Sequence, residues 1–427
     1  MSRPNSTSTG SESGGSSPTD TGATNRQRSE TVVRSSSSDP TIRWYEPGDV
    51  EQFLTLYETV WGTQKGPAWF DWRFLENPAA SGVEMVLAET DGQLVGAEPV
   101  MPYRLRAGDR TVAARQPVDW IVHPEYRRMG IFSSMTERLV AGLSEDASLL
   151  FNFPNEALRP GIERYGWRMI DTVGARYRVQ DPRAALEMGP SSTSVAVSKR
   201  AARLGSPLVR RGLGLLDRVG SPSDAVTVER ARGVPAGTVS SLYAENVPEQ
   251  MHVPRNRAFL EWRFANTRWE VETYVANRDS DVVATGIVAT ESIDGHDLVR
   301  LLDVQPMTTV AGDADAFESM LAALVEAHAD AAVLKLPTGL YPGVCRRHGF
   351  VCDDGFLFSR LSATTYHAVR PLEGDSISDA GDAEDSSIAG GSGDVAPWTA
   401  TIETDGRSFD LGDSADWLLA PGDMDVA

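Results

Sequence analysis

The tripeptide Trp-Arg-Phe occurs twice, in FDWRFLENP at residues 70–78 and in FLEWRFANT at residues 259–267. The two copies begin at Trp72 and Trp262, 190 residues apart. A second pair of related segments, FNFPNEALRPGIERYGW and LKLPTGLYPGVCRRHGF, shares a strand-like run, a proline, Pro-Gly, Arg and Gly-aromatic. Pro154 corresponds to Pro337, an offset of 337 − 154 = 183. Because both pairs of similar segments occur in the same order and at similar spacing, the sequence predicts an internal duplication.

The duplication predicts two folded stretches, at about 41–180 and 226–370, with the same order of elements. In the first stretch, apolar residues at helical spacing predict a helix over residues 50–62. Three strands follow, and because Asp-Gly and Gly-Asp turns join them, they should form an antiparallel meander. A helix from about 130 follows, with Ile131, Met135, Leu139 and Leu143 on one face. The Trp-Arg-Phe segments are most simply core anchors, with Arg73 as a partner for a carboxylate.

The remaining segments differ in composition from these two stretches. Residues 1–39 and 371–396 are poor in large apolar side chains, which predicts a disordered tail and an acidic disordered linker. Residues 397–427 predict a hairpin that docks through Trp398, Phe409 and Trp417. The linker at 181–225 is basic and helical, and its part 193–219 could associate weakly with a membrane surface or an acidic partner. We favour the simpler alternative, in which its arginines pair with the protein's own surface.

Composition excludes several classes of function. The 427 residues carry a formal net charge of −20, which does not attract nucleic acid. Lysine is confined to positions 65, 199 and 335, and this acidic, lysine-poor balance suggests adaptation to high salt. Cys345 and Cys352 form no CxxC signature, so we expect no metal and a reduced, cytoplasmic setting. No signal peptide or membrane-spanning run is visible.

The segment VDWIVHPEYRRMGIFSSM, residues 118–135, carries the most chemical information. A strand ends near Val122, a basic turn follows, and a helix starts near Gly130. The first amides of a helix lack internal partners and, together with the helix dipole, favour an anion. Arg127 and Arg128 add two guanidinium groups suited to phosphate. The sequence therefore predicts a phosphate-binding corner.

This segment resembles the acyl-CoA-binding signature of the GNAT superfamily, the GCN5-related N-acetyltransferases. The pattern Arg-x-x-Gly-x-Gly/Ala matches residues 127–132, except that Phe132 stands at the last position. Asn155, eleven residues before Gly166-Trp167, agrees with a second family element. The resemblance implies an α/β (α+β) fold of two tandem GNAT-like domains, each a mixed, mainly antiparallel sheet flanked by helices. It implies that acetyl-CoA contacts Ile121, Val122, Arg127, Arg128, Met129, Gly130, Ile131, Phe132, Ser133, Ser134 and Asn155.

The catalytic carboxylates are less well defined by the resemblance. Some relatives carry a Glu on the fourth strand, where this chain has Gln116, and a Tyr acid where it has Ile162. Asp119 and Glu98 remain as candidate bases on the central strands. For both, a structural hydrogen bond is the favoured alternative.

The resemblance covers 41–180 well and 226–370 only in topology, because no Arg-x-x-Gly turn follows Asp303. We therefore expect an acyl-CoA-dependent N-acyltransferase with a degenerate second domain, acetylating a primary amine of a small molecule or an amino sugar. One alternative is a non-catalytic CoA-binding or scaffolding protein. A second alternative is a tandem-GNAT aminoacyl transferase, against which the net charge argues.

Overall fold

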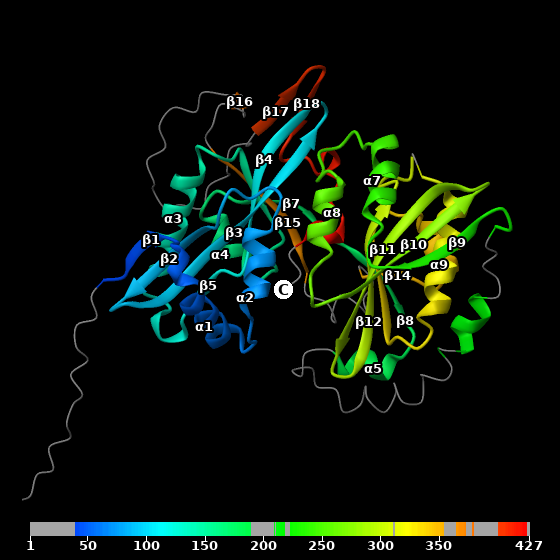
Figure 1. The fold of residues 1–427 in the computed structure, drawn as a ribbon, viewed down its shortest axis with the longest axis horizontal. Coiled ribbons are helices and arrows are strands. Elements are labelled where there is room, and N and C mark those ends of the chain that lie inside the picture. Colours follow the sequence, from blue (N-terminus) through cyan, green and yellow to red (C-terminus); the bar gives the residue numbers. More distant parts are fainter. Residues whose placement is uncertain are drawn as a thin grey trace, which may run out of the picture. The chain divides into compact units, whose positions relative to one another are not determined.

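A computed structural model describes residues 39–188, 209, 211–217, 223–310, 312–353, 364–372, 378–379 and 400–424 (Figure 1). The expected tail up to residue 38, most of the basic linker, Trp398 and most of the acidic linker lie outside these residues. The helix and the three-stranded meander expected near the start of the first stretch are confirmed.

The first sheet has the strand order β1-β2-β3-β4-β6-β15-β7, and β5 pairs with β3. All its neighbours are antiparallel except β4 and β6. Its strands are β1 (Thr41–Trp44), β2 (Glu84–Thr90), β3 (Gln93–Ala107), β4 (Arg110–Pro117), β5 (Ile121–Val122), β6 (Leu149–Asn152), β7 (Arg168–Thr172) and β15 (Tyr366–Pro371).

The second sheet repeats this arrangement in the order β14-β8-β13-β12-β11-β10-β9. Again one neighbouring pair, β12 and β13, is parallel. Its strands are β8 (Ala175–Val179), β9 (Thr227–Arg232), β10 (Glu270–Arg278), β11 (Asp281–Ile293), β12 (His296–Gln305), β13 (Val333–Pro337) and β14 (Val351–Cys352). The expected fold class, mixed and mainly antiparallel sheets flanked by helices, is confirmed.

One strand of each sheet comes from the other half of the chain. β8 ends the first stretch but lies between β13 and β14, and β15 ends the second stretch but lies between β6 and β7. The boundaries 41–180 and 226–370 therefore do not each enclose a complete sheet. Sequence periodicity identifies a strand but not its neighbour, so the exchange was not visible from the sequence.

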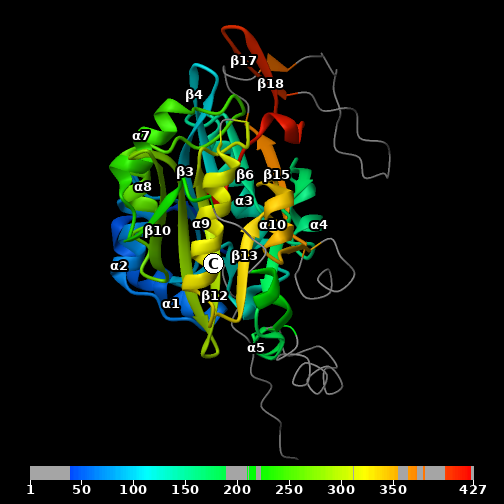
Figure 2. The ribbon, with the colours of Figure 1, turned by 90° about the vertical axis from the view of Figure 1, so that its right-hand side faces the viewer.

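Helices cover both faces of each sheet. On the first sheet, α3 packs on the face opposite α1, and the buried stripe Ile131, Met135, Leu139 and Leu143 is confirmed. On the second sheet, α9 lies along β10 and β11 (Figure 2). The helices are α1 (Val50–Trp61), α2 (Pro67–Phe70), α3 (Ile131–Leu143), α4 (Arg159–Glu163), α5 (Pro182–Glu187), α7 (Ala236–Glu245), α8 (Arg257–Arg263), α9 (Ala314–Ala327) and α10 (Pro342–Arg347). Shorter turns are η1 (Pro47–Asp49), η2 (Asp71–Leu75, a π-helix), η3 (Pro124–Tyr126), η4 (Ser414–Asp416) and η5 (Pro421–Asp423).

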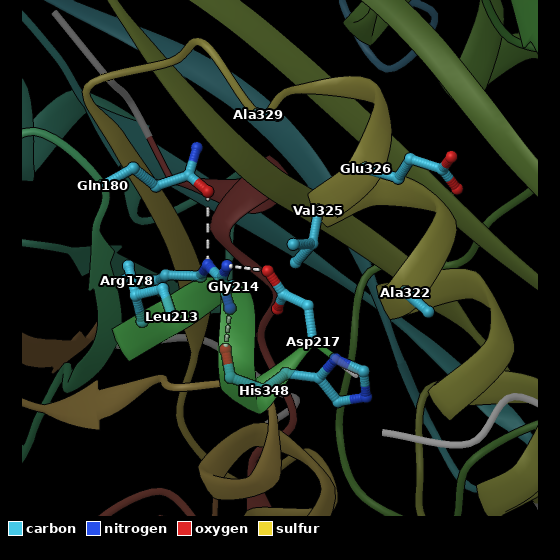
Figure 3. A pocket seen from close by; sticks show the side chains of 10 residues that line it. All are labelled: Arg178, Gln180, Leu213, Gly214, Asp217, Ala322, Val325, Glu326, Ala329 and His348. Carbon is cyan, nitrogen blue, oxygen red and sulfur yellow. Dashed lines mark hydrogen bonds and ion pairs between the residues drawn. The ribbon is translucent and has the colours of Figure 1, made fainter. Parts of the chain in front are cut away.

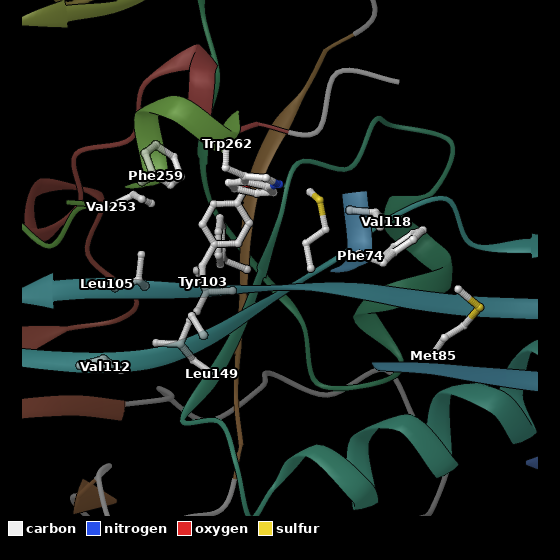
Figure 4. Close-up of a cluster of buried hydrophobic side chains, with 14 of the residues drawn as sticks. Phe74, Met85, Tyr103, Leu105, Val112, Val118, Leu149, Val253, Phe259 and Trp262 are labelled. Carbon is white, nitrogen blue, oxygen red and sulfur yellow. The ribbon is translucent and has the colours of Figure 1, made fainter. Parts of the chain in front are cut away.

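The two Trp-Arg-Phe motifs meet in the largest apolar core. The rings of Trp72 and Trp262 stack with centroids 6.2 Å apart. Each indole N–H donates to the backbone carbonyl of the other tryptophan, at 2.8 Å from Trp72 and 2.6 Å from Trp262. Phe259 and Tyr103 pack beside Trp262 in the same cluster (Figure 4). The packing role of the motif is confirmed, and the motif joins the two halves.

The C-terminal hairpin is formed by β17 (Ala400–Thr404) and β18 (Arg407–Asp410), which form a small sheet with β16 (Ser378–Asp379). Phe409 and Trp417 are buried in the same core as the two Trp-Arg-Phe motifs. The hairpin therefore docks on the first sheet's core, as its aromatic residues suggested.

The paired indoles predict a loss of stability when either indole N–H is removed. Replacing Trp72 or Trp262 with Phe keeps the ring but leaves a buried carbonyl without its donor, which costs about 1–3 kcal/mol. Urea unfolding should show this loss in either variant. Trp61→Phe, at a side chain that is 53% exposed, is the matched control and should change stability by less than about 0.5 kcal/mol. Equal midpoints for all three variants would contradict the proposed role of these hydrogen bonds.

A buried histidine predicts pH-dependent stability. His252 donates from Nδ1 to the Gln250 carbonyl and accepts from the Tyr243 hydroxyl at Nε2, which fixes the neutral ring. Burial lowers the pKa of His252 from 6.5 to about 4. Between these values the unfolded chain binds more protons, so stability falls as the pH drops from 6.5 to 4, by up to roughly 3 kcal/mol.

The test compares urea midpoints across this pH range. His252→Gln should flatten the slope, whereas the same change at the half-exposed His123 should not. A slope that is identical in all three proteins would show that His252 does not titrate with unfolding.

Candidate functional site

The central strand of the first sheet contains a bulge. Pro117 pairs with Val100, and Ile121 pairs with Ala97. The chain therefore advances four residues from β4 to β5 while β3 advances three, which leaves one extra residue opposite β3. Asp119, within the extra segment, has φ +47°, a left-handed conformation uncommon for a residue other than glycine. A bulge of this kind redirects side chains and opens the ladder of hydrogen bonds.

The bulge lies where two strands separate. β4 and β6 pair only at Ala114 with Leu149 and at Arg115 with Leu150. Within the described residues, the two strands do not pair beyond Arg115. The Trp120 indole Nε1 is buried there and has no hydrogen-bond acceptor among the described residues. Buried donors without acceptors are rare in proteins, so this one marks a place where a ligand could accept a hydrogen bond.

The basic turn leads directly into α3. Arg127, Arg128, Met129 and Gly130 are exposed, and Gly130 has φ +80° at the N-cap position. No side chain caps the helix, and within the described residues no backbone carbonyl accepts from the amides of its first three residues. The corner is therefore open to solvent and offers unpaired donors beside two guanidinium groups, as the sequence predicted.

Aromatic side chains line the start of α3. The Phe132 ring contacts Trp120, with centroids 5.3 Å apart, and Tyr165, at 5.9 Å. The Tyr165 hydroxyl donates to Ser133 Oγ at 2.6 Å, and Ser134 is exposed at the next position. These contacts connect α3 to the end of α4 and explain how a bulky Phe132 is accommodated beside the turn.

Asn155 and Gly166 lie on either side of α4 in the chain. The Asn155 side-chain oxygen accepts from the Leu158 amide at 3.1 Å and so begins the turn before the helix. Gly166 ends the segment with φ +78°. Ile162, at the position where the resemblance placed a Tyr acid, is fully buried against the α3 core.

Asp119 is held by the first Trp-Arg-Phe motif. Arg73 Nη2 lies 2.8 Å from Asp119 Oδ2, and both side chains are less than 5% exposed. The Arg73 guanidinium also lies over the Trp69 ring, 5.3 Å from its centroid. Spacing in the sequence suggested that Arg73 pairs with a carboxylate but not which one, because the two residues meet only through the packing of η2 on the bulge.

Glu98 lies on the opposite face of the sheet, under α3. It is fully buried and shares a hydrogen bond with the Thr136 hydroxyl at 2.9 Å. Burial raises the pKa of Glu98 well above its usual range. The Thr136 hydroxyl also contacts the Phe132 carbonyl at 2.9 Å, and its single proton cannot serve both oxygens. A neutral Glu98 that donates to Thr136 satisfies both contacts.

The C-terminal segment reaches the fourth strand, which the sequence did not reveal. Gln116 Nε2 donates to the Asp423 carbonyl at 3.1 Å, and the Tyr103 hydroxyl donates to the same oxygen at 3.4 Å. The Asp423 carboxylate binds Arg255, which also binds Asp303. The position where relatives carry a Glu is thus occupied by an amide that anchors the end of the chain.

The second domain closes the corresponding helix start. At the N-terminus of α9, the Asp313 carboxylate accepts from the amides of Asp315 and Ala316, both at 3.0 Å. Arg278 in turn pairs with Asp313 at 2.8 Å. The donors that are free at α3 are therefore already used at α9, in agreement with the expected loss of the phosphate site in this half.

A cavity of about 480 Å³ also lies in the second domain, beside α9 (Figure 3). Its main polar group, Arg178, donates to the His348 carbonyl, to Asp217 and to Gln180. These groups satisfy one another, so the cavity offers less to a ligand than the α3 corner does. Within the described part of the chain, no cluster of His, Cys, Asp or Glu could hold a metal, and no helix is long and apolar enough to cross a membrane.

The Arg73–Asp119 pair predicts a specific loss of stability. Arg73→Met leaves a buried carboxylate unpaired and should cost about 3–5 kcal/mol in urea unfolding. Arg257→Met is the control, because its pair with Glu261 is exposed, and it should cost less than about 1 kcal/mol. Adding Asp119→Asn to Arg73→Met should recover part of the loss. A double variant no more stable than Arg73→Met alone would contradict the buried charge as the cause.

Comparisons with known proteins agree with the fold described above. Residues 41–170 match the family model described as an acetyltransferase (GNAT) domain. No curated protein matches the chain. The solved structure of a GCN5-related N-acetyltransferase from Anabaena variabilis is 10% identical, with a TM-score of 0.53, and the match covers 78% of this chain and 73% of that one. A probable N-acyltransferase from Enterococcus faecalis is 13% identical, with a TM-score of 0.54 and coverage of 79% and 73%. Residues 41–170 are therefore similar to a GNAT acetyltransferase domain, and the solved structures share the fold of the larger part of the chain.

Proposed function

We propose that the protein is an acyl-CoA-dependent N-acyltransferase that moves acetyl from acetyl-CoA to a primary amine of a small molecule or amino sugar. The observation that carries the proposal is the uncapped start of α3 beside Arg127 and Arg128. A diphosphate fits such a corner because backbone donors and positive charge converge on it. Residues 128–134 would surround the diphosphate of the donor, with Arg127 at its edge.

The difference between the two helix starts supports this assignment. α9 has the same place in the second sheet, but the Asp313 carboxylate occupies its first amides. The Asp313 carboxylate occupies the position at α9 that we assign to the diphosphate at α3, and its negative charge repels a second anion. The proposal therefore assigns donor binding to the first domain alone, and the second domain contributes packing.

The gap between β4 and β6 would hold the pantetheine arm of acetyl-CoA. Ile121, Val122 and the unpaired Trp120 indole lie at this gap, so the pantetheine arm could accept a hydrogen bond from Trp120. A backbone amide of the bulge would face the thioester oxygen and stabilise the negative charge that develops on it. Asn155 would lie at the α4 end of the same gap.

The transfer itself needs few groups. The lone pair of a neutral amine adds to the thioester carbon, the thiolate then leaves, and the amine gives up one proton. Of the two candidate bases, we retain Asp119, which lies on the bulge and is held in place by Arg73. Glu98 lies beneath α3 with a raised pKa, and we assign it the support of Thr136 and the helix start.

One observation favours the non-catalytic alternative. The buried Ile162 cannot protonate a leaving thiolate, and the Tyr165 hydroxyl is engaged by Ser133. A thiolate leaves readily without help, so a CoA-binding scaffold and an enzyme differ in turnover rather than in donor binding. The experiments below separate the two.

Calorimetric titration with acetyl-CoA tests the donor site. Gly130→Glu places a carboxylate beside the free amides and should weaken binding at least about tenfold. Gly92→Glu is a closely matched control, because Gly92 has φ +78° in an exposed turn and, like Gly130, open space around its Cα. Any strain of the backbone is common to both variants. Binding that is equally weak or equally strong in the two variants would reject the α3 corner as the donor site.

Thiol release with a panel of amines tests the chemistry. Turnover that is present in Gly92→Glu and absent in Gly130→Glu is expected for the enzyme. Intact acetyl-CoA binding without release on any amine would instead favour the scaffold.

A further inference from the structure

A second cavity lies where two strands of the second sheet separate. The last recorded pair between β12 and β13 joins Arg300 to Lys335. Beyond it lies a cavity of about 270 Å³, whose lining includes these two residues, Tyr177 of β8, Asp353, Pro337, Pro421 and Met424. The Lys335 side chain lies on the face of the sheet opposite α9, since its neighbours Leu334 and Leu336 pack in the α9 core.

The cationic groups of this cavity have unused hydrogen-bonding capacity. Lys335 Nζ lies 5.5 Å from the centroid of the Tyr177 ring, and among the described residues no side chain forms an ion pair or hydrogen bond with it. Arg300 binds Glu291 through Nη2 at 2.8 Å, but its buried Nε has no acceptor in the described part of the chain. The nearby Asp353 carboxylate accepts from the Ala175 amide. A half-buried ammonium that forms no ion pair is rare in a folded protein.

The environment of Lys335 disfavours its charge in the absence of a ligand. Burial lowers the pKa of Lys335, Arg300 lowers it further, and Asp353 opposes the shift. An anion in the cavity would offset the desolvation of both cations. The other walls include a tyrosine ring, two prolines, a methionine and leucines beside Asp353, and their apolar part suits an apolar body.

We propose that this cavity binds a small organic acid, with its carboxylate between Lys335 and Arg300 and its apolar body against Tyr177, Pro337 and Met424. The volume excludes a nucleotide-sized ligand such as a whole coenzyme, and the α9 start that could hold a diphosphate is closed by Asp313. The site is therefore separate from the α3 corner in both place and chemistry.

The native protein provides the first test, with benzoate as the probe and benzyl alcohol as its neutral counterpart. The sequence has lysines only at 65, 199 and 335, so amine labelling with acetic anhydride can be followed at each by mass spectrometry. Saturating benzoate should slow labelling of Lys335 at least about tenfold, whereas benzyl alcohol should not, because a charge-assisted hydrogen bond supplies the difference. Lys65, which also lies over aromatic rings, is the internal control and should label equally throughout.

Variants provide the second test. Benzoate should raise the melting temperature of the native protein and of Lys65→Met but not of Lys335→Met. Gly130→Glu should retain both the shift and the protection of Lys335, which separates failure of this proposal from failure of the donor site. Equal protection by benzoate and benzyl alcohol, or protection of Lys65 to the same extent, would overturn the proposal. If Lys335→Met does not fold, the labelling of the native protein decides.

Discussion

Each sheet is completed by a strand from the other half of the chain, and this exchange connects the folding of both halves. β15 lies between β6 and β7, while β8 lies between β13 and β14. Without its borrowed strand, either sheet would leave the backbone groups of two strands unpaired along one side, and buried backbone groups must be paired. The reciprocal hydrogen bonds of Trp72 and Trp262 add a second link between the halves. The domain at residues 41–170 therefore depends on the second half of the chain, even though the start of α9 there is capped by Asp313.

The same exchange helps to keep the candidate site open. β6 is bound to β4 through two residue pairs but to β15 through four, Leu149–Asn152 against Ala368–Pro371. The borrowed strand thus holds β6 from the side away from the bulge. Because β4 and β6 do not pair after Arg115, the gap beside the buried Trp120 indole is built into the pairing and does not require a ligand to form.

Sequence reasoning succeeded where the determining interactions are local. The uncapped turn before α3 can be read from Arg-Arg-Met-Gly, and the closed start of α9 from the Asp of GDADAF, because capping is decided within four residues. The buried stripe of α3 and the Asp-Gly turns follow from periodicity and turn chemistry in the same way. The strand exchange, the pairing of Arg73 with Asp119 and the arrival of Asp423 at Gln116 depend on contacts between distant segments. No spacing or composition encodes which buried strand or charge will be the neighbour, so these features required the structure.

The C-terminal segment is fixed between the two sheets by a buried cluster of charges. Arg255 binds the carboxylates of Asp303 and Asp423, and all three side chains are at most 1% exposed. A buried cation with two carboxylates fixes the position of η5 strongly, since loss of any partner leaves a charge unpaired in the interior. Through the Asp423 carbonyl, η5 also holds Gln116 of the first sheet. A glutamate at position 116 would place a carboxylate against that carbonyl oxygen, whereas the Gln116 amide donates to it, so the docked C-terminal segment favours an amide at this position.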